Sequence, residues 1–476
     1  MEWEIVIGLE AHAQLATRTK LFCGCSTQFG AEPNAQCCPV CLGLPGVLPV
    51  LNRRAFEYGL KTALALQCEI PDFVVFDRKN YYYPDLPKNY QISQNYRNLG
   101  TNGRLVLPLN GGRVVRIHNV HLEEDAGKLI HPEGRDLGYS LVDLNRSGVP
   151  LVEIVTEPDL RSVAEAEVYM NTLAAILQYL GVSECKMQEG SLRLEASISL
   201  RERGSDKLGN RVEIKNLNSF KAVLKSLEYE IGRQRRLLEK GQPVSRETRL
   251  WNEERGTTEP MRSKELAHDY RYFPEPDLRP VTIPRQWLDE IRSSLPELPH
   301  IRKSRFVEDY ALPEYDAAIL TADRHVADFF EECVRAGSEP KAVSNWVLTE
   351  VLRYLNEKKL TIREIKLRPS DLVELIGLVK NGKVTHQAAK AIFDTVLQTG
   401  KHPAEVVEQE GLSQISDEEP LRKLCTEVVR KHPKAVEDFK KGKKASFAFL
   451  MGQVMRETRG KANPQLVQKI LVELLQ

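Results

Sequence analysis

Short apolar runs bounded by turn residues dominate the first 290 residues of the chain, whereas longer segments with helical spacing fill the rest. In the first part, Val, Ile and Leu alternate with polar residues between Gly, Pro and Asn turns, a pattern typical of β-strands. The stretches with this pattern are 3–8, 104–109, 113–121, 192–200 and 211–215. The pattern therefore predicts that the first part is rich in β-structure.

Two helices are expected inside this first part. Ser162 followed by Glu165 forms a capping box. Apolar residues then recur at helical spacing up to Gly181, a residue type that often ends a helix. A second helix is expected over 219–238, and the proline-rich stretch 272–284 predicts an extended exit from this part.

Helical periodicity dominates from about residue 285 onward, with polar breaks such as 368–371 between the segments. A polar, acidic stretch at 398–420 precedes a last helical piece. The sequence therefore predicts an α+β fold in three parts: a β-rich part over 1–290, an all-α part over 291–408 and a small helical tail over 409–476.

Composition narrows the class of protein. The chain has 476 residues, a net charge of +1 and 28% charged residues, which is an ordinary globular composition. Its first ten residues are acidic where a signal peptide would be basic, and no apolar run is long enough to cross a bilayer. Four of the nine cysteines are scattered singly, which argues against a secreted disulfide framework. A cytoplasmic protein is expected.

The other five cysteines lie within 23–41. Cys23 and Cys25 form one close pair and Cys38 and Cys41 another, with twelve residues between the pairs. This spacing suits tetrahedral zinc bound by four thiolates, a structural site with no open position. Cys37 is then the spare thiol. The alternative is a group of buried cysteines that act as small apolar side chains.

The stretch VIGLEAHAQL places Glu10, His12 and Gln14 on one face if it is a strand. A carboxylate and an imidazole on one face could bind a divalent metal or act as an acid–base pair. A solvated polar face is the alternative.

A second acidic group, HLEED, offers His121, Glu123, Glu124 and Asp125. Three successive carboxylates repel one another unless cations lie nearby. Oxygen-rich clusters of this kind suit magnesium, which also holds substrate phosphates. An exposed acidic turn is the alternative.

The stretch 76–94 interleaves basic and aromatic residues: Arg78, Lys79, Tyr81, Tyr82, Tyr83, Lys88 and Tyr90. Phosphate contacts and stacking surfaces of this kind suit a nucleotide or a tRNA terminus. The strand-to-helix junction 212–220 adds Glu213, Lys215, Asn216, Asn218 and Ser219, where backbone N–H groups could meet an anion. The sequence has neither a P-loop nor a G-x-G-x-x-G motif, so any ATP site belongs to another class.

The tail is locally basic. Between 431 and 461 there are nine Lys or Arg residues against three acids. This excess indicates a nucleic-acid partner, with a merely solvated basic face as the alternative.

Eleven blocks of sequence, spread over almost the whole chain, carry a resemblance to a known family. They are IGLEAHAQL, FGAEPN, CPVCLGLPGVLPVLN, FDRKNYYYPDLPKNYQISQ, HLEEDAGK, VDLNRSGVPLVEIVTEPDLRS, VEIKNLNSF, ETRLW, MRSKE, DYRYFPEPDL and MGQVMRETRGKANP. In this order they closely resemble GatB, one of the subunits of the glutamine-dependent aspartyl/glutamyl-tRNA amidotransferases.

The resemblance implies a ligase that forms carbon–nitrogen bonds with glutamine as amido donor. In this family ATP phosphorylates the side-chain carboxylate of Glu on tRNA(Gln), of Asp on tRNA(Asn), or of both. Ammonia from the glutaminase subunit GatA then displaces the phosphate, and a small subunit, GatC, completes the heterotrimer. The implied fold is a β-rich catalytic cradle, a helical domain and a YqeY-like tail that contacts tRNA.

The resemblance also places the family's magnesium ligands at Glu10, His12 and Glu124, with the catalytic role there. Glu123, Asp125 and Glu213 are expected around these ligands. The residues expected to contact ATP or the tRNA end are Lys79, Tyr81, Tyr82, Lys88, Arg146, Lys215, Asn216 and Ser219.

Two departures from the family pattern affect these expectations. Glu195 stands where the family often has a shorter acid, so it is only a candidate ligand. Some members lack the cysteines, which implies that zinc is dispensable for the chemistry. A zinc-containing module that only positions mischarged tRNA is the main alternative function. A free-standing glutaminase is a weaker one, because no amidase Ser–Ser–Lys pattern is seen.

Overall fold

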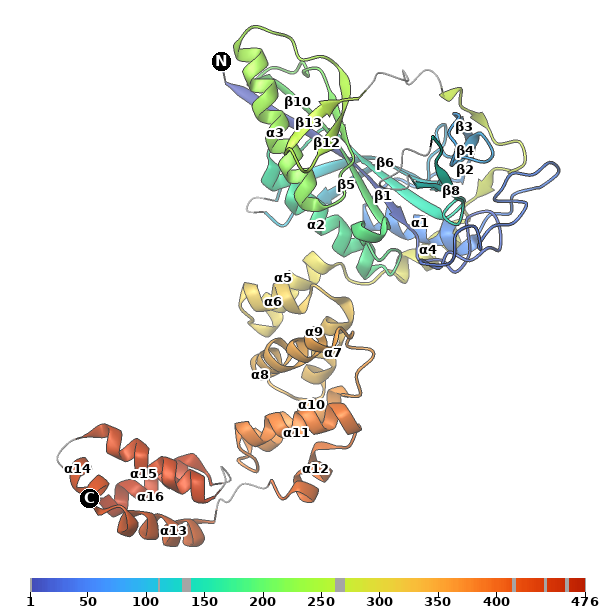
Figure 1. Ribbon diagram of the computed structural model, residues 1–476. Helices are drawn as coiled ribbons and strands as arrows, with labels where there is room; N and C mark the ends of the chain where they lie inside the picture. The colour runs from blue at the N-terminus through green and yellow to red at the C-terminus, as the bar shows by residue number, and fades with distance from the viewer. Residues whose placement is uncertain are drawn as a thin grey trace. The chain divides into compact units, whose positions relative to one another are not determined.

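The computed structural model shows two compact units, Met1–His300 and Ile301–Gln476 (Figure 1). The described residues are 2–109, 112–130, 138–261, 270–412, 417–440, 443–458 and 462–475. The β-rich first part and the helical remainder confirm the predicted α+β class.

An eight-stranded sheet organises the first unit, in the order β13-β12-β11-β10-β1-β9-β6-β5 (Figure 1). Neighbouring strands are antiparallel except for the parallel pair β11 and β12. The strands are β1 (Trp3–Gln14), β5 (Gly100–Val106), β6 (Val114–Glu124), β9 (Pro150–Thr156), β10 (Leu192–Glu202), β11 (Val212–Lys215), β12 (Glu247–Asn252) and β13 (Thr257–Pro260). Every strand that the sequence predicted corresponds to one of these.

Three helices cover one face of this sheet: α1 (Arg53–Ala65), α2 (Val163–Tyr179) and α3 (Phe220–Glu239). Ile7, Leu9, Ala11 and Ala13 of β1 point to that face and are buried in the core. The alternate residues of β1 therefore point to the opposite face, which is polar. The central strands are thus apolar on one face and carry polar side chains, including Glu10 and His12, on the other.

The predicted helix starts are present, with one difference at α2. The Ser162 side chain accepts from the Glu165 N–H, as a cap should, but the Glu165 carboxylate accepts from the N–H of Arg161 and not from that of Ser162. At α3 the Ser219 side chain accepts from the N–H of Ala222.

Short strands form smaller sheets beside the large one. β3 (Asp77–Asn80) pairs with β4 (Tyr90–Ser93) and with β14 (Phe273–Pro274), while β2 (Phe73–Val74) pairs with β15 (Val281–Thr282). A further pair is β7 (Lys128–Ile130) and β8 (Leu141–Asp143). The proline-rich stretch is therefore extended, as predicted, and pairs back onto the basic and aromatic stretch. α4 (Arg285–Ser293) follows it and buries Ile291 in the first core.

Every element that the structure describes in the second unit is a helix. Its helices are α5 (Pro299–Tyr310), α6 (Glu314–Leu320), α7 (Arg324–Arg335), α8 (Pro340–Trp346), α9 (Leu352–Lys358), α10 (Pro369–Lys380), α11 (His386–Thr399), α12 (Pro403–Glu410), α13 (Glu418–Lys431), α14 (Pro433–Lys440), α15 (Lys444–Glu457) and α16 (Pro464–Leu475). α8 and α9 are joined by a π-helical turn, Val347–Val351. One core lies within Phe306–Val407 and another within Leu421–Leu475. The division near 409 stays a prediction.

Among the described residues, no helix is both long enough and apolar enough to span a membrane.

Candidate functional site

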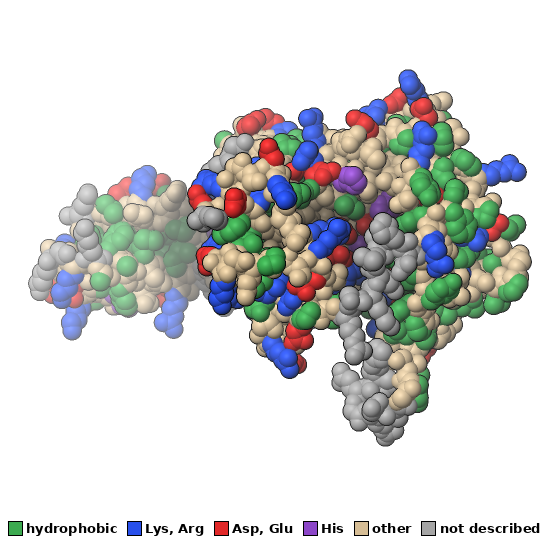
Figure 2. Space-filling view, turned by 90° about the horizontal axis from the view of Figure 1, so that it is seen from above, with side chains coloured by type: hydrophobic (Ala, Val, Ile, Leu, Met, Phe, Trp, Pro, Cys, Tyr) green, Lys and Arg blue, Asp and Glu red, His purple; other side chains and the backbone are tan. Residues whose placement is uncertain are grey.

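The polar face of the central strands brings together side chains from four neighbouring strands. Glu10 and His12 of β1 pair in register with Glu195 and Arg193 of β10, and His12 also pairs with Glu153 of β9. On β6, His121 lies opposite Glu153. Figure 2 shows histidines, acids and bases gathered in a hollow of the first unit. Alternation along antiparallel strands therefore builds one continuous polar surface.

A histidine–carboxylate cluster lies at the centre of this surface. His12 Nε2 is 3.2 Å from Glu153 Oε2 and 3.6 Å from Glu123 Oε1. The ligand atoms of His12, Glu123 and Glu153 all lie within 4.8 Å of one another. His121 Nε2 is 2.9 Å from Glu153 Oε2, and His121 Nδ1 is 2.9 Å from Asn119 Oδ1. Two carboxylates and an imidazole this close fit a small divalent cation.

The charges of the cluster depend strongly on one another. Burial raises the pKa of Glu123, and the negative charge of Glu153 raises it further. Burial would also raise the pKa of Glu153, but the charges of His121 and His12 outweigh it and hold that pKa well below its usual range. Burial opposes protonation of His12, yet Glu153 and Glu123 raise its pKa to about 9. The buried carboxylates therefore attract positive charge, which the imidazoles carry when protonated and which a bound cation would supply when they are neutral.

Lys79 and three tyrosines border the cluster on the β6 side. Burial lowers the pKa of Lys79, but the charge of Glu123 and then of nearby tyrosines and Glu153 raises it overall, so the ammonium stays charged. Its Nζ lies 4.8 Å from the centre of the Tyr270 ring. Tyr270 is 6.1 Å from Tyr81 and 6.1 Å from Tyr272, centre to centre. A cation beside aromatic faces is suited to a phosphate and a base.

A second group of charges lies on the β10 side. Lys215 Nζ is 3.1 Å from Glu195 Oε2 and 3.1 Å from Glu213 Oε1. Burial raises the pKa of Glu10, as do the charges of Glu153, Glu195 and Glu213. Glu10 therefore lies between the histidine–carboxylate cluster and this lysine-bridged pair of acids.

Asp125 is held by three polar side chains. Gln14 Nε2 donates to Asp125 Oδ2 at 2.9 Å, and Arg193 Nη2 is 3.0 Å from Asp125 Oδ1. Arg146 Nε is 3.5 Å from Asp125 Oδ2 and also donates to the backbone carbonyl of Ala126. Asp125 and Arg146 thus fix the turn after β6.

Glu124 does not join Glu10 and His12, which corrects the expected three-residue set. On β6, Leu122 and Glu124 point to the core face, whereas His121 and Glu123 point to the polar face. The Glu124 carboxylate pairs with Lys88 and accepts from the backbone N–H of Ile92 at 2.9 Å. Glu123 occupies the place expected for Glu124. The sequence did contain an indication of this arrangement. Leu122 is apolar, so strand alternation places Glu124 on the same core face and Glu123 on the opposite, polar face.

Of the remaining residues expected to contact ATP or tRNA, some border the polar face and others lie away from it. Lys79, Tyr81 and Lys215 border the polar face, whereas Lys88 is paired with Glu124. Tyr82 is 71% exposed. Asn216 Nδ2 donates to the carbonyl of Trp251 at 3.0 Å, and Ser219 caps α3, so both have structural contacts. Glu153, Tyr270 and Tyr272 reach the site without having been predicted. Glu153 was hidden in an apolar strand.

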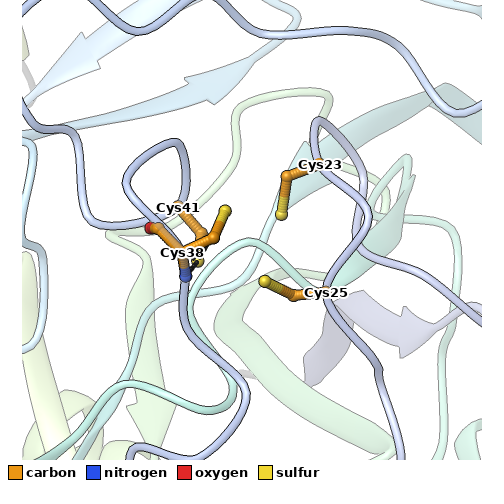
Figure 3. Close-up of side chains that lie close together, drawn as sticks. All are labelled: Cys23, Cys25, Cys38 and Cys41. Carbon is orange, nitrogen blue, oxygen red and sulfur yellow. Dashed lines mark hydrogen bonds between the residues drawn. The ribbon is translucent and has the colours of Figure 1, made fainter.

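The four predicted zinc ligands form a separate cluster (Figure 3). The sulfurs of Cys23, Cys25, Cys38 and Cys41 all lie within 4.8 Å of one another, and those of Cys23 and Cys25 point toward the other pair. The Cys38 N–H donates to Cys41 Sγ at 3.1 Å. A hydrogen bond from Cys23, helped by the Cys38 N–H and the charge of Lys20, lowers the pKa of the Cys41 thiol to about 4. The donor set fits tetrahedral zinc.

Lys20 is a neighbour of this cluster that the sequence did not reveal. Its side chain is fully buried, and its Nζ donates to the carbonyl of Gln36 at 2.7 Å and to Cys41 Sγ at 3.5 Å. A buried ammonium beside a set of thiolates partly balances their charge.

The basic run of the tail is only partly within the described residues. Lys441, Arg459 and Lys461 lie outside them, as does the side chain of Lys444. Lys431, Lys434, Lys440, Lys443 and Arg456 lie within them, on or next to α13, α14 and α15.

Comparison with known proteins decides the family. A model described as the GatB/GatE catalytic domain matches residues 5–289, and another described as the GatB domain matches residues 328–475. The chain belongs to the GatB family. The second GatB match begins before the predicted border at 409 and so crosses it. The histidine–carboxylate cluster and the cysteine cluster both lie within the region matched by the GatB/GatE catalytic domain.

Full-length GatB relatives share about half of the sequence. A protein of Thermoanaerobacter sp. (strain X514), named as the B subunit of aspartyl/glutamyl-tRNA(Asn/Gln) amidotransferase, is 53% identical over 476 residues, which is 100% of both chains. Proteins of the same name from Thermodesulfovibrio yellowstonii and Carboxydothermus hydrogenoformans are 53% and 52% identical over the whole of this chain, covering 100% and 99% of their own lengths.

Proposed function

We propose that this chain is the component of a tRNA-dependent amidotransferase that activates a tRNA-bound carboxylate with ATP and converts it to an amide. The substrate is Glu on tRNA(Gln), Asp on tRNA(Asn), or both. The names of the full-length relatives and the matched catalytic domain support this function over the alternative of a module that only positions tRNA. The main structural support for this function is the His12–Glu123–Glu153 cluster, which lies beside Lys79.

The polar face offers the groups that phosphoryl transfer requires. His12, Glu123 and Glu153, with Glu10 beside them, would hold magnesium, which when bound neutralises charge on phosphate oxygens. Lys79 supplies a fixed positive charge to the same phosphates. Tyr81, Tyr270 and Tyr272 provide ring faces for the terminal adenosine of the tRNA.

The proposed reaction has two steps, phosphorylation of the carboxylate and displacement of the phosphate by ammonia. A carboxylate oxygen of the tRNA-bound amino acid attacks the γ-phosphorus of ATP, the bond to the bridging oxygen breaks, and ADP leaves. The nitrogen of ammonia then attacks the acyl carbon, loses a proton to solvent, and inorganic phosphate leaves. Two anions approach each other in the first step, so positive charge at the site lowers its barrier.

The proposed reaction also requires partner subunits and contacts to tRNA. Glutamine hydrolysis in a GatA subunit would supply the ammonia, and a GatC subunit would complete the complex. The basic residues Lys431, Lys434, Lys440 and Lys443 of the tail would contact tRNA phosphates. The reaction would take place in the cytoplasm.

Zinc has a structural role in this proposal. Cys23, Cys25, Cys38 and Cys41 would fill all four positions around the ion, so no position is left for a substrate. Binding would tie the loop between β1 and α1 into one shape.

A matched pair of histidine variants tests the function. His12→Ala removes a cluster side chain, whereas His118→Ala removes an exposed histidine of β6 that pairs only with Glu157 among the described contacts. In the complex with its partner subunits, we expect His12→Ala to lower ATP-dependent amidation of Glu-tRNA(Gln) and Asp-tRNA(Asn) by at least about 100-fold, the scale of a lost charge-stabilising group. His118→Ala should keep wild-type activity.

Binding of mischarged tRNA should be nearly unchanged in both variants. If His12→Ala retains wild-type amidation, the cluster has no part in the reaction, and the tRNA-positioning module becomes the better explanation.

A further inference from the structure

Lys20 is a fully buried lysine whose positive charge must be balanced inside the fold. Its Nζ donates to the carbonyl of Gln36 at 2.7 Å, to the carbonyl of Leu144 at 3.4 Å and to Cys41 Sγ at 3.5 Å. An ammonium group has three N–H donors and no acceptor. Each donor of Lys20 therefore has one partner, and one of these partners is a predicted zinc ligand.

The counter-charge of Lys20 is not a carboxylate. Among the described residues, the hydrogen-bond partners of its Nζ are two carbonyls and a sulfur. Glu124 lines the same small cavity as Lys20, but the Glu124 carboxylate pairs with Lys88 and accepts from the N–H of Ile92. Of the three acceptors of Lys20, only Cys41 can become an anion. The thiolate of Cys41 is therefore the partner that balances this buried charge.

Backbone contacts keep Lys20 beside Cys41. The N–H of Lys20 donates to the carbonyl of Cys25 at 3.0 Å, and the N–H of Leu21 donates to the carbonyl of Gly148 at 2.9 Å. Gly148 has a φ of +86°, and a Cβ atom there would lie 3.4 Å from Lys20 Cδ and 3.5 Å from Cys41 Cβ. The turn at Gly148 thus packs closely against both side chains and holds the ammonium at the sulfur.

A set of four thiolates needs such a positive group. Zinc with four thiolates carries a net charge of about −2, which is costly away from water. Cys23, Cys25 and Cys38 are half-buried, whereas Cys41 is buried and has the least access to water. The ammonium of Lys20 and the N–H of Cys38, which is 3.1 Å from Cys41 Sγ, take the place of water there.

We propose that Lys20 is a positioning residue of the zinc site, which holds the Cys41 thiolate in place and offsets one negative charge of the four-thiolate set. This role rests on the zinc site of the proposed function and is independent of the proposed reaction. Lys20 acts through Cys41 and is not itself a ligand. Loss of a group that hydrogen-bonds to a metal ligand typically weakens metal binding by about 10–100-fold.

Lys20→Met tests the inference, because methionine is of similar length but has neither the charge nor the N–H donors. Lys20→Gln can still donate to the carbonyls but lacks the charge, and Lys61→Met removes a lysine of α1 that pairs with Glu57. Competition with a chromogenic chelator measures the affinity of each full-length chain for Zn²⁺. We expect Lys20→Met and Lys20→Gln to bind zinc about 10–100-fold more weakly than wild type, and Lys61→Met to bind it equally well.

Cobalt gives a readout that a merely structural role would not change. Co²⁺ bound by four thiolates absorbs through charge transfer from sulfur to metal, and the energy of this transition falls when a positive charge beside the sulfur is removed. The charge-transfer band of cobalt-loaded Lys20→Met and Lys20→Gln should therefore lie at longer wavelength than that of wild type or Lys61→Met.

Thermal unfolding completes the test. The rise in Tm on zinc binding should be smaller in Lys20→Gln than in wild type, because the bound state is stabilised less. Unchanged zinc affinity, or an equal fall in Tm with and without zinc together with an unchanged cobalt band, would overturn the inference. A wild-type chain that does not bind zinc would overturn both the inference and the zinc part of the proposed function. The amidation test with His12→Ala is independent of these results, so the failures are distinguishable.

Discussion

A single-residue step along β6 determines which carboxylate meets the histidines. Glu123 lies beside His12, whereas Glu124 lies on the core side with Lys88. The Lys88 and Glu124 side chains are only 9% and 4% exposed, so each is the other's main counter-charge away from water. Removal of one partner from such a pair leaves a buried charge.

We therefore expect Lys88→Met to lower the free energy of unfolding by about 3–5 kcal/mol, because Glu124 would lose its partner. The double variant Lys88→Met/Glu124→Gln should recover a large part of that loss. Urea titration followed by fluorescence measures both. If Lys88→Met is as stable as wild type and instead loses only ATP binding, Lys88 is a phosphate contact and not a buried partner.

The sequence shows which charged and aromatic residues are available for a site, but it does not show which of them contact one another. Charged and aromatic residues in strand-like stretches are conspicuous in a sequence, and of those expected at the site Glu10, His12, Lys79, Tyr81 and Lys215 lie on or beside the polar face, while their roles stay predictions. Glu153 was missed because it lies in an apolar strand, and its role depends on register with His12 and His121. Register comes from the pairing of distant strands, which local patterns do not specify.

The loop between β1 and α1 depends on its cysteines. It carries no helix or strand of its own in the described residues, and its four clustered sulfurs bring residues 23–25 and 38–41 together. Cys37 is next to Cys38 in sequence but is not a member of the four-sulfur group. The C-P-V-C spacing predicted this choice.

Cys38→Ala should lower the zinc content of the purified protein to well under one ion per chain, whereas Cys37→Ala should retain it. The reason is that three thiolates bind zinc more weakly than four. Atomic absorption after dialysis against a mild chelator measures the content. Loss of zinc in Cys37→Ala but not in Cys38→Ala would reverse the assignment of ligands.

For the chain as a unit, the change from strand-like to helical patterning predicted the α+β class, and the cap at Ser162 predicted the start of α2. The order of the eight strands was not predictable, because β1 pairs with β10 and β9, more than 130 residues away. That order places His12, Glu153 and Glu123 on adjacent strands, so the residues of the site come together only when these distant strands pair.

Transfer of the γ-phosphoryl group to aminoacyl-tRNA shows directly whether the polar face carries out the phosphoryl transfer. The complex is mixed with γ-³²P-labelled ATP, magnesium and Glu-tRNA(Gln) without glutamine or ammonia, and label on the tRNA fraction is counted after rapid quenching. Wild type and His118→Ala should yield labelled aminoacyl-tRNA, and His12→Ala should yield none, because the site that stabilises the transferring phosphoryl group is lost. Equal labelling by His12→Ala and wild type would contradict the claim that this polar face carries out the phosphoryl transfer.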